Sequence, residues 1–523
     1  MPLEDGLSNC FSENFPWLEM SPAVLFAQSQ DGAGYAIIPS TRIFTNDEQL
    51  LPLALRLAYG FTGAAELTEP PAILRLSENG AQPGRGDVTL ELTAPDTLDV
   101  RIPFHGKAET YRIDVTQSIH VTAQNLDAMA RALTTLHKAA RVSPLLDSGV
   151  IIDAPAYAER SVMIDMGRRQ FSPDWVICLI KEMAWNQLNT LHLHLTDNEG
   201  VRVIFPSCPD LASDDAWSAA DLKRVLDFAA ANRVQVIPEL DMPGHMDWIL
   251  RNRPHLQLKL DKGQVVSKAL DFSLDEARDL MTTLFSDLLD MFPDSRYIHL
   301  GADEYFLPPI TAQNTPQLAQ YARQASGNPD AGSQDAVRHF VNELANFIKA
   351  KGRVARAWND SAVQRNPVIA LDTQVQIECW SLWWAKGPNY LDVQDLIDAG
   401  YTVLNAQYDF YFIINKTWDN LYHKHHSPHG IYDVWRANLF VSKPGSSAYT
   451  EIPADSPALA GAGIQLWIEV PSFSSPEEMW THLQPWLLPL GQRTWDSPNA
   501  APSYKSLSAT ARAIAHSPAI PRW

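Results

Sequence analysis

At 523 residues the chain is long enough for two or more domains, and its 46% hydrophobic and 20% charged residues are typical of a globular protein. The formal net charge of −20 argues against a nucleic-acid partner, because such binding needs a basic surface. The four cysteines lie far apart without metal-ligand spacing, so we expect neither a metal nor another cofactor.

The N-terminal residues have no basic region and no uninterrupted apolar stretch, so no signal peptide is expected. No segment approaches the roughly 18 apolar residues of a membrane span. We therefore expect a cytoplasmic setting.

Residues 1–150 alternate short strands with turns and predict a small α+β domain. Two-residue apolar periods mark the half-buried strands, and one segment with helical spacing follows them. The expected strands lie at 72–76, 88–92, 111–115 and 119–123, and the helix at 126–138.

From residue 151 to 523 the pattern becomes strand, helix, strand, which predicts a (β/α)8 barrel with long loops and a C-terminal helical tail. Ser218 with Asp221, and Ser273 with Glu276, predict capping boxes at two helix starts. The eight expected strands lie at 162–166, 190–195, 234–240, 297–300, 354–358, 375–380, 402–405 and 464–467.

Polar and aromatic residues gather at the C-terminal ends of these strands, which is the face where such barrels place their active sites. Among them, Asp303 and Glu304 are adjacent, so each charge raises the other's pKa, and burial adds to the rise. We expect one carboxylate to be ionised and the other held as an acid, as in glycoside cleavage. The whole set is Asp197, Asp241, His245, Asp303, Glu304, Trp358, Asp360, Trp380, Tyr411, Trp467 and Glu469.

Several blocks of the sequence resemble glycoside hydrolase family 20, the β-N-acetylhexosaminidases. The chain reads Ile-Pro-Glu-Leu-Asp-Met-Pro-Gly-His at 237–245 and His-Leu-Gly-Ala-Asp-Glu at 299–304. Ala302 replaces a glycine of the family signature, and Val201 stands where the family often has tryptophan. An alanine at 302 is tolerated if its φ is negative. Three further blocks, at 160–168, 191–197 and 465–469, and the 1–150 region also resemble the family.

This resemblance implies an exo-acting enzyme that hydrolyses terminal β-linked GlcNAc or GalNAc through an oxazolinium intermediate, because the substrate's own acetamido oxygen attacks the anomeric carbon. It assigns Glu304 as the general acid and later base, and Asp303 as the group that accepts the acetamido N–H. Tyr411 is the expected donor to the acetamido oxygen, with Tyr408 as an alternative.

The remaining site residues also follow from the resemblance. Asp197 and His245 would form a hydrogen-bonded relay behind the acid and tune its pKa. Arg160, together with Glu469, is expected to hold sugar hydroxyls through charge-assisted hydrogen bonds. Arg168 is expected in an internal salt bridge with the aspartate three residues before it. The pocket walls are expected from Trp358, Trp380 and Trp467.

Other functions remain open at this stage. A lacto-N-biosidase-like pocket of the same family would accept a disaccharide. A metal-dependent amidohydrolase could use His192 and His194, which share a strand face, but the ends of predicted strands four to six lack the Lys or His that it would need. A non-catalytic sugar-binding protein is a third reading. The histidines at 423–429 are expected in a solvated loop. The expected partner is an oligosaccharide or glycoconjugate with a terminal N-acetylhexosamine.

Overall fold

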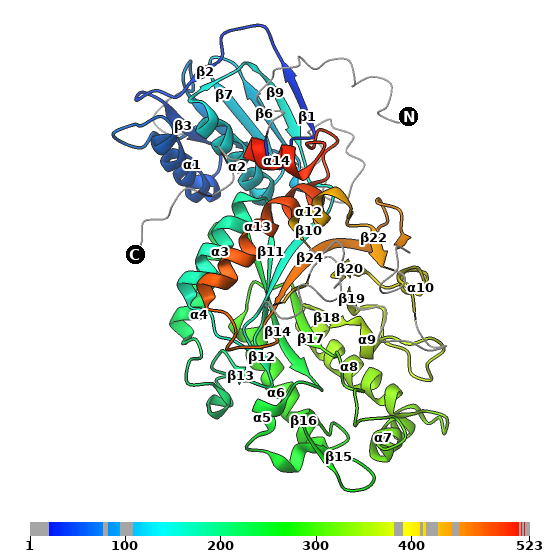
Figure 1. The fold of residues 1–523 in the computed structure, drawn as a ribbon. Coiled ribbons are helices and arrows are strands. Elements are labelled where there is room, and N and C mark those ends of the chain that lie inside the picture. The colour runs from blue at the N-terminus through cyan, green and yellow to red at the C-terminus, as the bar shows by residue number, and fades with distance from the viewer. Residues whose placement is uncertain are drawn as a thin grey trace.

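The computed structural model describes residues 20–76, 82–94, 108–380, 391–407, 412–414, 427–441, 449–511, 514 and 517. An N-terminal sheet domain precedes a parallel barrel (Figure 1). Each has its own apolar core, because the buried residues form two large separate clusters.

The N-terminal domain is a seven-stranded mixed sheet in the order β1-β9-β6-β7-β5-β3-β4. Its strands are β1 (Phe26–Ser29), β3 (Arg42–Thr45), β4 (Ala72–Arg75), β5 (Val88–Leu92), β6 (Tyr111–Val115), β7 (Ile119–Ala123) and β9 (Gly149–Asp153), and β2 (Tyr35–Ala36) pairs with β8 (Leu145–Leu146). The helices α1 (Leu51–Ala64) and α2 (Leu126–Val142) pack against each other and on this sheet. The sheet domain therefore extends to residue 153, and the first barrel strand begins at residue 159.

The barrel contains eight parallel strands, and the last pairs with the first to close it. In sheet order these are β10 (Glu159–Asp165), β11 (Thr190–His194), β14 (Gln235–Met242), β17 (Tyr297–Gly301), β18 (Val354–Trp358), β19 (Gln376–Cys379), β20 (Val403–Asn405) and β24 (Leu459–Trp467). This confirms the predicted (β/α)8 barrel. The eighth strand begins five residues before its predicted start, and β21 (Phe412–Ile414) also pairs with its C-terminal half.

Most helices that follow the N-terminal domain lie around the barrel strands, and the last, at residues 504–511, lies beside the N-terminal sheet (Figure 1). They are α3 (Pro173–Trp185), α4 (Ala219–Ala231), α5 (Asp247–Leu250), α6 (Asp275–Met291), α7 (Pro316–Ser326), α8 (Ser333–Ala350), α9 (Asn359–Ala362), α10 (Val393–Asp398), α12 (Pro428–Asp433), α13 (Pro476–Trp495) and α14 (Tyr504–Ala511). The loops add the pairs β12 (Thr196–Asp197) with β13 (Gly200–Val201), β15 (Gln257–Lys259) with β16 (Val265–Leu270), and β22 (Leu439–Val441) with β23 (Tyr449–Glu451). Over the described part of the chain, no helix is both long and apolar enough to cross a membrane.

The helix starts test the predicted capping boxes. Ser218 and Asp221 form a reciprocal box at the start of α4, as predicted. The box predicted from Ser273 and Glu276 is wrong, because α6 begins at residue 275 and the Ser273 hydroxyl instead donates to Asp271.

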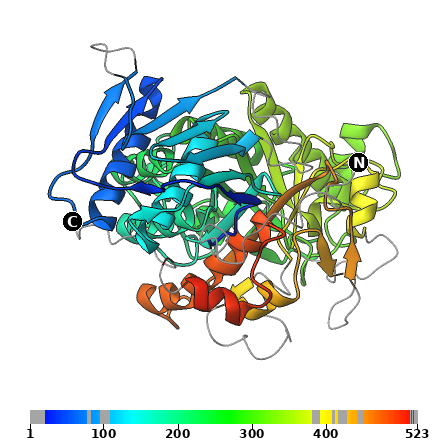
Figure 2. The ribbon, with the colours of Figure 1, turned by 90° about the horizontal axis from the view of Figure 1, so that it is seen from above.

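The C-terminal helices return to the N-terminal domain, as the view from above also shows (Figure 2). Trp495, at the end of α13, packs in the N-terminal core, and its indole donates to Asp153 over 2.9 Å. The barrel is thereby fixed to the sheet domain at its N-terminal end, and the opposite end is left for the loops that follow the strands.

Candidate active site

The turn after β17 carries the adjacent carboxylates in a strained backbone. Gly301, Ala302 and Glu304 all have left-handed φ values, of 71°, 69° and 48°. A side chain at residue 301 would place its Cβ 1.8 Å from an oxygen of Asp241, so only glycine fits there. The condition of a negative φ for Ala302 is therefore not met. Left-handed non-glycine residues cost about 1–2 kcal/mol each and persist only where the surroundings hold them.

His245 lies at the centre of the charged groups, and it too is left-handed, with a φ of 53°. Its Nδ1 is 3.3 Å from Asp197, and its Nε2 is 3.5 Å from Glu304 and 3.7 Å from Asp303. Burial alone would lower the pKa of this imidazole, but the charges of Asp197 and Asp303 outweigh it and raise the pKa well above its usual value. A buried imidazolium therefore faces the carboxylate pair, in the position predicted for the relay.

The two carboxyls have pKa shifts of opposite sign. Burial raises the pKa of Asp303, His245 opposes this rise, and the charge of Glu304 adds to it. Burial would also raise the pKa of Glu304, but the hydrogen bond and the charge of His245 outweigh it and lower the pKa. The imidazolium of His245 thus favours the ionised form of Glu304, whereas burial disfavours the ionised form of Asp303.

The pKa values of two further aspartates, Asp197 and Asp241, are also shifted in opposite directions. Asp197 accepts from His194 over 3.0 Å and pairs with Arg168 over 3.0 Å. Burial would raise the pKa of Asp197, but Arg168 and His245 hold it well below its usual value. Burial and the charge of Asp303 raise the pKa of Asp241 well above its usual value, and within the described part of the chain its carboxyl oxygens have no hydrogen-bond partner.

Arg160 does not lie at this site. It is the second residue of β10, so it lies at the opposite end of the barrel from Glu304. Its guanidinium is fully buried and makes a two-pronged ion pair with Glu109 of the N-terminal domain, at 2.8 and 2.9 Å. The sugar-binding role predicted for Arg160 is therefore corrected to that of a structural link between the two domains.

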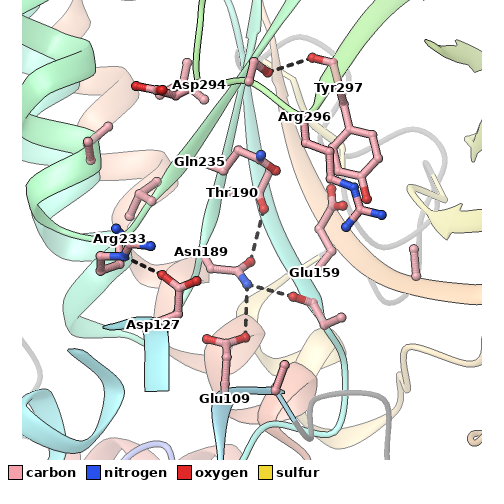
Figure 3. Close-up of a pocket in the computed structure, with 18 of the residues that line it drawn as sticks. Glu109, Asp127, Glu159, Asn189, Thr190, Arg233, Gln235, Asp294, Arg296 and Tyr297 are labelled. Atoms are coloured by element: carbon pink, nitrogen blue, oxygen red, sulfur yellow. Dashed lines mark hydrogen bonds and ion pairs between the residues drawn. The ribbon is translucent and has the colours of Figure 1, made fainter. Parts of the chain in front are cut away.

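The cavity next to this ion pair is shown in Figure 3. It has a volume of about 900 Å³ at the N-terminal end of the barrel. Several of its charged groups are paired with one another: Arg233 with Asp127, as Figure 3 shows, and Arg131 with Glu109. It lies away from the carboxylate pair, so we do not assign the chemistry to it.

Arg168, eight residues after Arg160, lies at the rim beside the carboxylates. Its guanidinium contacts Asp165 and Asp197, each at 3.0 Å, and lies 5.4 Å from the ring centre of Trp467. The predicted salt bridge to Asp165 is confirmed. Glu469 is exposed at the same rim, and its charge interacts with that of Arg168. Arg168 and Glu469 therefore lie at the rim with the carboxylates, whereas Arg160 does not.

The three predicted wall tryptophans come together in one apolar cluster, with Met163 and Ala406. The rings of Trp358 and Trp467 have centres 5.9 Å apart. The indole of Trp380 donates to Asp360 over 2.9 Å. The structure thus brings Trp358, Trp380 and Trp467 together, and Asp360 links Trp380 to the turn of the carboxylates, because it also accepts the backbone N–H of Glu304.

His192 and His194 point into the barrel, where both contact Glu239, at 2.9 and 2.7 Å. Glu239 lies close enough to His192 and His299 to hold a metal ion with them, and it forms a second such group with His194 and Asp241. Without a metal ion, nearby carboxylates outweigh burial and raise the pKa of His192 to about 9, so a metal would have to displace a proton from this imidazole. The arrangement fits an imidazolium–carboxylate network better than a metal site. Tyr408, Tyr411 and residues 423–426 lie outside the described residues, so their predicted roles stay predictions.

Comparisons with known proteins agree with this geometry. The catalytic-domain model of glycosyl hydrolase family 20 matches residues 157–498. The lacto-N-biosidase of Bifidobacterium bifidum is 27% identical over 356 residues, which cover 67% of this chain and 29% of that protein. The β-N-acetylhexosaminidase of Cellulomonas fimi is 28% identical over 375 residues, covering 66% of this chain and 70% of its own. The β-hexosaminidase 1 of Coccidioides posadasii is 25% identical, with 54% of its length covered. The chain thus spans less than two thirds of the Bifidobacterium and Coccidioides proteins.

Solved structures share the fold. The β-N-acetylhexosaminidase of Bacteroides fragilis superposes with a TM-score of 0.72 at 20% identity, covering 94% of each chain. A mutant β-hexosaminidase of Streptomyces plicatus, solved in complex with its product GlcNAc, gives a TM-score of 0.68 at 22% identity over 92% of this chain and 91% of its own.

Proposed function

Because the chain belongs to glycosyl hydrolase family 20, we propose that it is an exo-acting β-N-acetylhexosaminidase that releases terminal β-linked GlcNAc or GalNAc by substrate-assisted, retaining catalysis. The observation that carries this proposal concerns the Oδ1 atom of Asp303. This buried carboxyl oxygen has no hydrogen-bond partner among the described residues and lies next to the proton donor in sequence and space. A buried acceptor without a partner is costly, and the N–H of a 2-acetamido group would satisfy it.

The shifted pKa values support a defined order of events. When the acetamido N–H donates to Asp303, it favours the ionised form of that carboxyl and lowers its pKa. The bound sugar also displaces water from Glu304, and desolvation favours the protonated form of a carboxyl. The first effect favours ionised Asp303 and the second favours protonated Glu304, and the proposed reaction needs both states.

The proposed reaction then follows. The acetamido oxygen attacks the anomeric carbon while Glu304 protonates the departing oxygen and the glycosidic bond breaks. Asp303 holds the amide N–H and stabilises the positive charge that develops on the cyclic intermediate. Glu304, now a base, takes a proton from the water that opens this intermediate. Arg168 and Glu469 are placed to hold sugar hydroxyls, with the three tryptophans as walls.

The test is hydrolysis of an aryl β-GlcNAc and of the matching aryl β-glucoside by purified protein. We expect release of the aryl group from the first substrate only, and loss of most of that activity in Glu304→Gln. Equal turnover of the glucoside, which has no acetamido group, would refute substrate assistance.

A lacto-N-biosidase-like activity is the second candidate, because the first of the relatives described above carries that activity by name. An aryl lacto-N-bioside separates the two candidates. Release of the intact disaccharide, without release of GlcNAc from the simple aryl glycoside, would favour this second candidate.

A further inference from the structure

The short helix α9, which follows β18, connects the carboxylate turn to the tryptophan wall. Asp360 Oδ2 accepts the backbone N–H of Glu304 over 2.7 Å, and its Oδ1 accepts the indole N–H of Trp380 over 2.9 Å. The residues on either side of Asp360 also bind the carboxylate turn and the backbone at Trp380. Ser361 accepts the N–H of Tyr305 over 3.3 Å, and Asn359 accepts the backbone N–H of Trp380 over 3.0 Å.

We propose that Asp360 is a positioning residue of the hydrolytic reaction: its one carboxylate fixes the peptide of Glu304 and the indole of Trp380, and thereby aligns the proton donor with the pocket wall. The inference rests on the proposed function. Asp360 itself does not touch the reacting atoms.

The backbone at Glu304 explains why such a group is needed. A φ of 48° is unfavourable for glutamate, so the turn keeps this conformation only if something holds its N–H groups. Asp360 and Ser361 accept two successive N–H groups of the turn, at Glu304 and Tyr305. Without these acceptors the turn can relax, and the acid then moves away from the glycosidic oxygen.

The charge state of Asp360 is consistent with this placement. Burial, together with the charge of Asp303, raises the pKa of Asp360 to about 7, although the N–H groups of Glu304 and Trp380 oppose the rise. Both carboxyl oxygens are nonetheless used as acceptors, each by one N–H donor. An amide at this position could accept only one of the two donors, because its nitrogen is itself a donor.

The experiment compares kcat/KM for two substrates, phenyl β-GlcNAc and 2,4-dinitrophenyl β-GlcNAc. The phenyl group needs a proton to leave, whereas the dinitrophenyl group departs as a stable anion and needs little acid assistance. In Asp360→Asn we expect kcat/KM to fall about 100-fold for the phenyl substrate, as for a misplacement of about 1 Å, but only a few-fold for the dinitrophenyl substrate. An equal loss with both substrates, or no loss, would overturn the inference.

Two further variants test whether the effect is specific to the contacts of Asp360 with the carboxylate turn. Asp287→Asn removes a carboxylate that likewise accepts a backbone N–H and a side-chain donor, both from Ser207 at 2.8 Å and away from the site. It should affect both substrates equally. If Asp360→Asn does not fold, Ser361→Ala gives a milder test, in which a larger loss for the phenyl substrate supports the inference and an equal loss opposes it. A wild-type protein inactive on both substrates would refute the proposed function, which is a distinct outcome.

Discussion

Replacing His245 by asparagine should move the pH–rate profile to higher pH, because the imidazolium lies beside both catalytic carboxyls. Its Nε2 is 3.5 Å from Glu304 and 3.7 Å from Asp303. Two unit charges at the shorter distance interact by about 5 kcal/mol at an effective dielectric constant of about 20, and by about 1 kcal/mol in bulk water. Since one pKa unit corresponds to about 1.4 kcal/mol, each carboxyl pKa should rise by about 1 to 3 units.

The sign follows from the charge. A cation favours the ionised form of a carboxyl, so its removal raises the pKa. The active state is the carboxyl pair holding one proton, and the two limbs of the kcat/KM profile report the two macroscopic pKa values of that pair. Both limbs should therefore move upward together. Asparagine also tolerates the left-handed backbone of residue 245, so the fold should be kept.

The assay is kcat/KM for an aryl β-GlcNAc between about pH 3 and pH 9. His255 provides the matched control, because it pairs with Glu276 over 2.9 Å on the surface. His255→Asn should leave the profile in place. If His245→Asn lowered activity at every pH but did not move either limb, the electrostatic account of the carboxyl pair would be refuted.

Three other predictions follow from the same geometry. Arg168→Lys should lower kcat/KM about 100-fold and also lower the free energy of unfolding, because this guanidinium pairs with the buried Asp165 and Asp197. Arg160→Lys should lower the free energy of unfolding by about 2 kcal/mol but leave kcat/KM within about twofold. Steady-state kinetics and urea unfolding measure both. Ala302→Gly should stabilise the protein by up to about 1 kcal/mol, whereas Gly301→Ala should destabilise it by about 3 kcal/mol, as urea unfolding would show. Exhaustive chelation should leave activity unchanged, and loss of activity that zinc restores would favour the amidohydrolase alternative.

Most of the fold could be predicted because the strand signal is local. Apolar runs and two-residue periods depend on neighbours in sequence, so all eight barrel strands lie within a few residues of their predicted positions. The predicted cap at Ser273 is absent because Asp271, two residues earlier, accepts its hydroxyl. Such competition depends on loop geometry, which a capping pattern does not contain.

The residues of the site could be predicted from the sequence only where their position at the end of a strand identified them. Arg160 and Arg168 stand in one block of sequence, but β10 runs from one end of the barrel to the other between them. The position of each along the strand was a sufficient signal, because Arg160 falls at the start of the strand and Arg168 after its end. Asp360 was placed on the rim but given no role, because its two partners lie 56 and 20 residues away.

The same reasoning explains why the directions of the two carboxyl pKa shifts could not be predicted from the motif. Two adjacent carboxylates predict unequal pKa values, but the direction depends on which of them the imidazolium favours. That imidazolium is held in a continuous series of contacts from the rim through the barrel interior. The series runs through Glu304, His245, Asp197, His194, Glu239, His192, Glu378, Arg356 and Glu159. Six barrel strands, or the loops after them, contribute residues to this series. The pKa of the acid therefore depends on the closed barrel, and no single sequence motif could predict it.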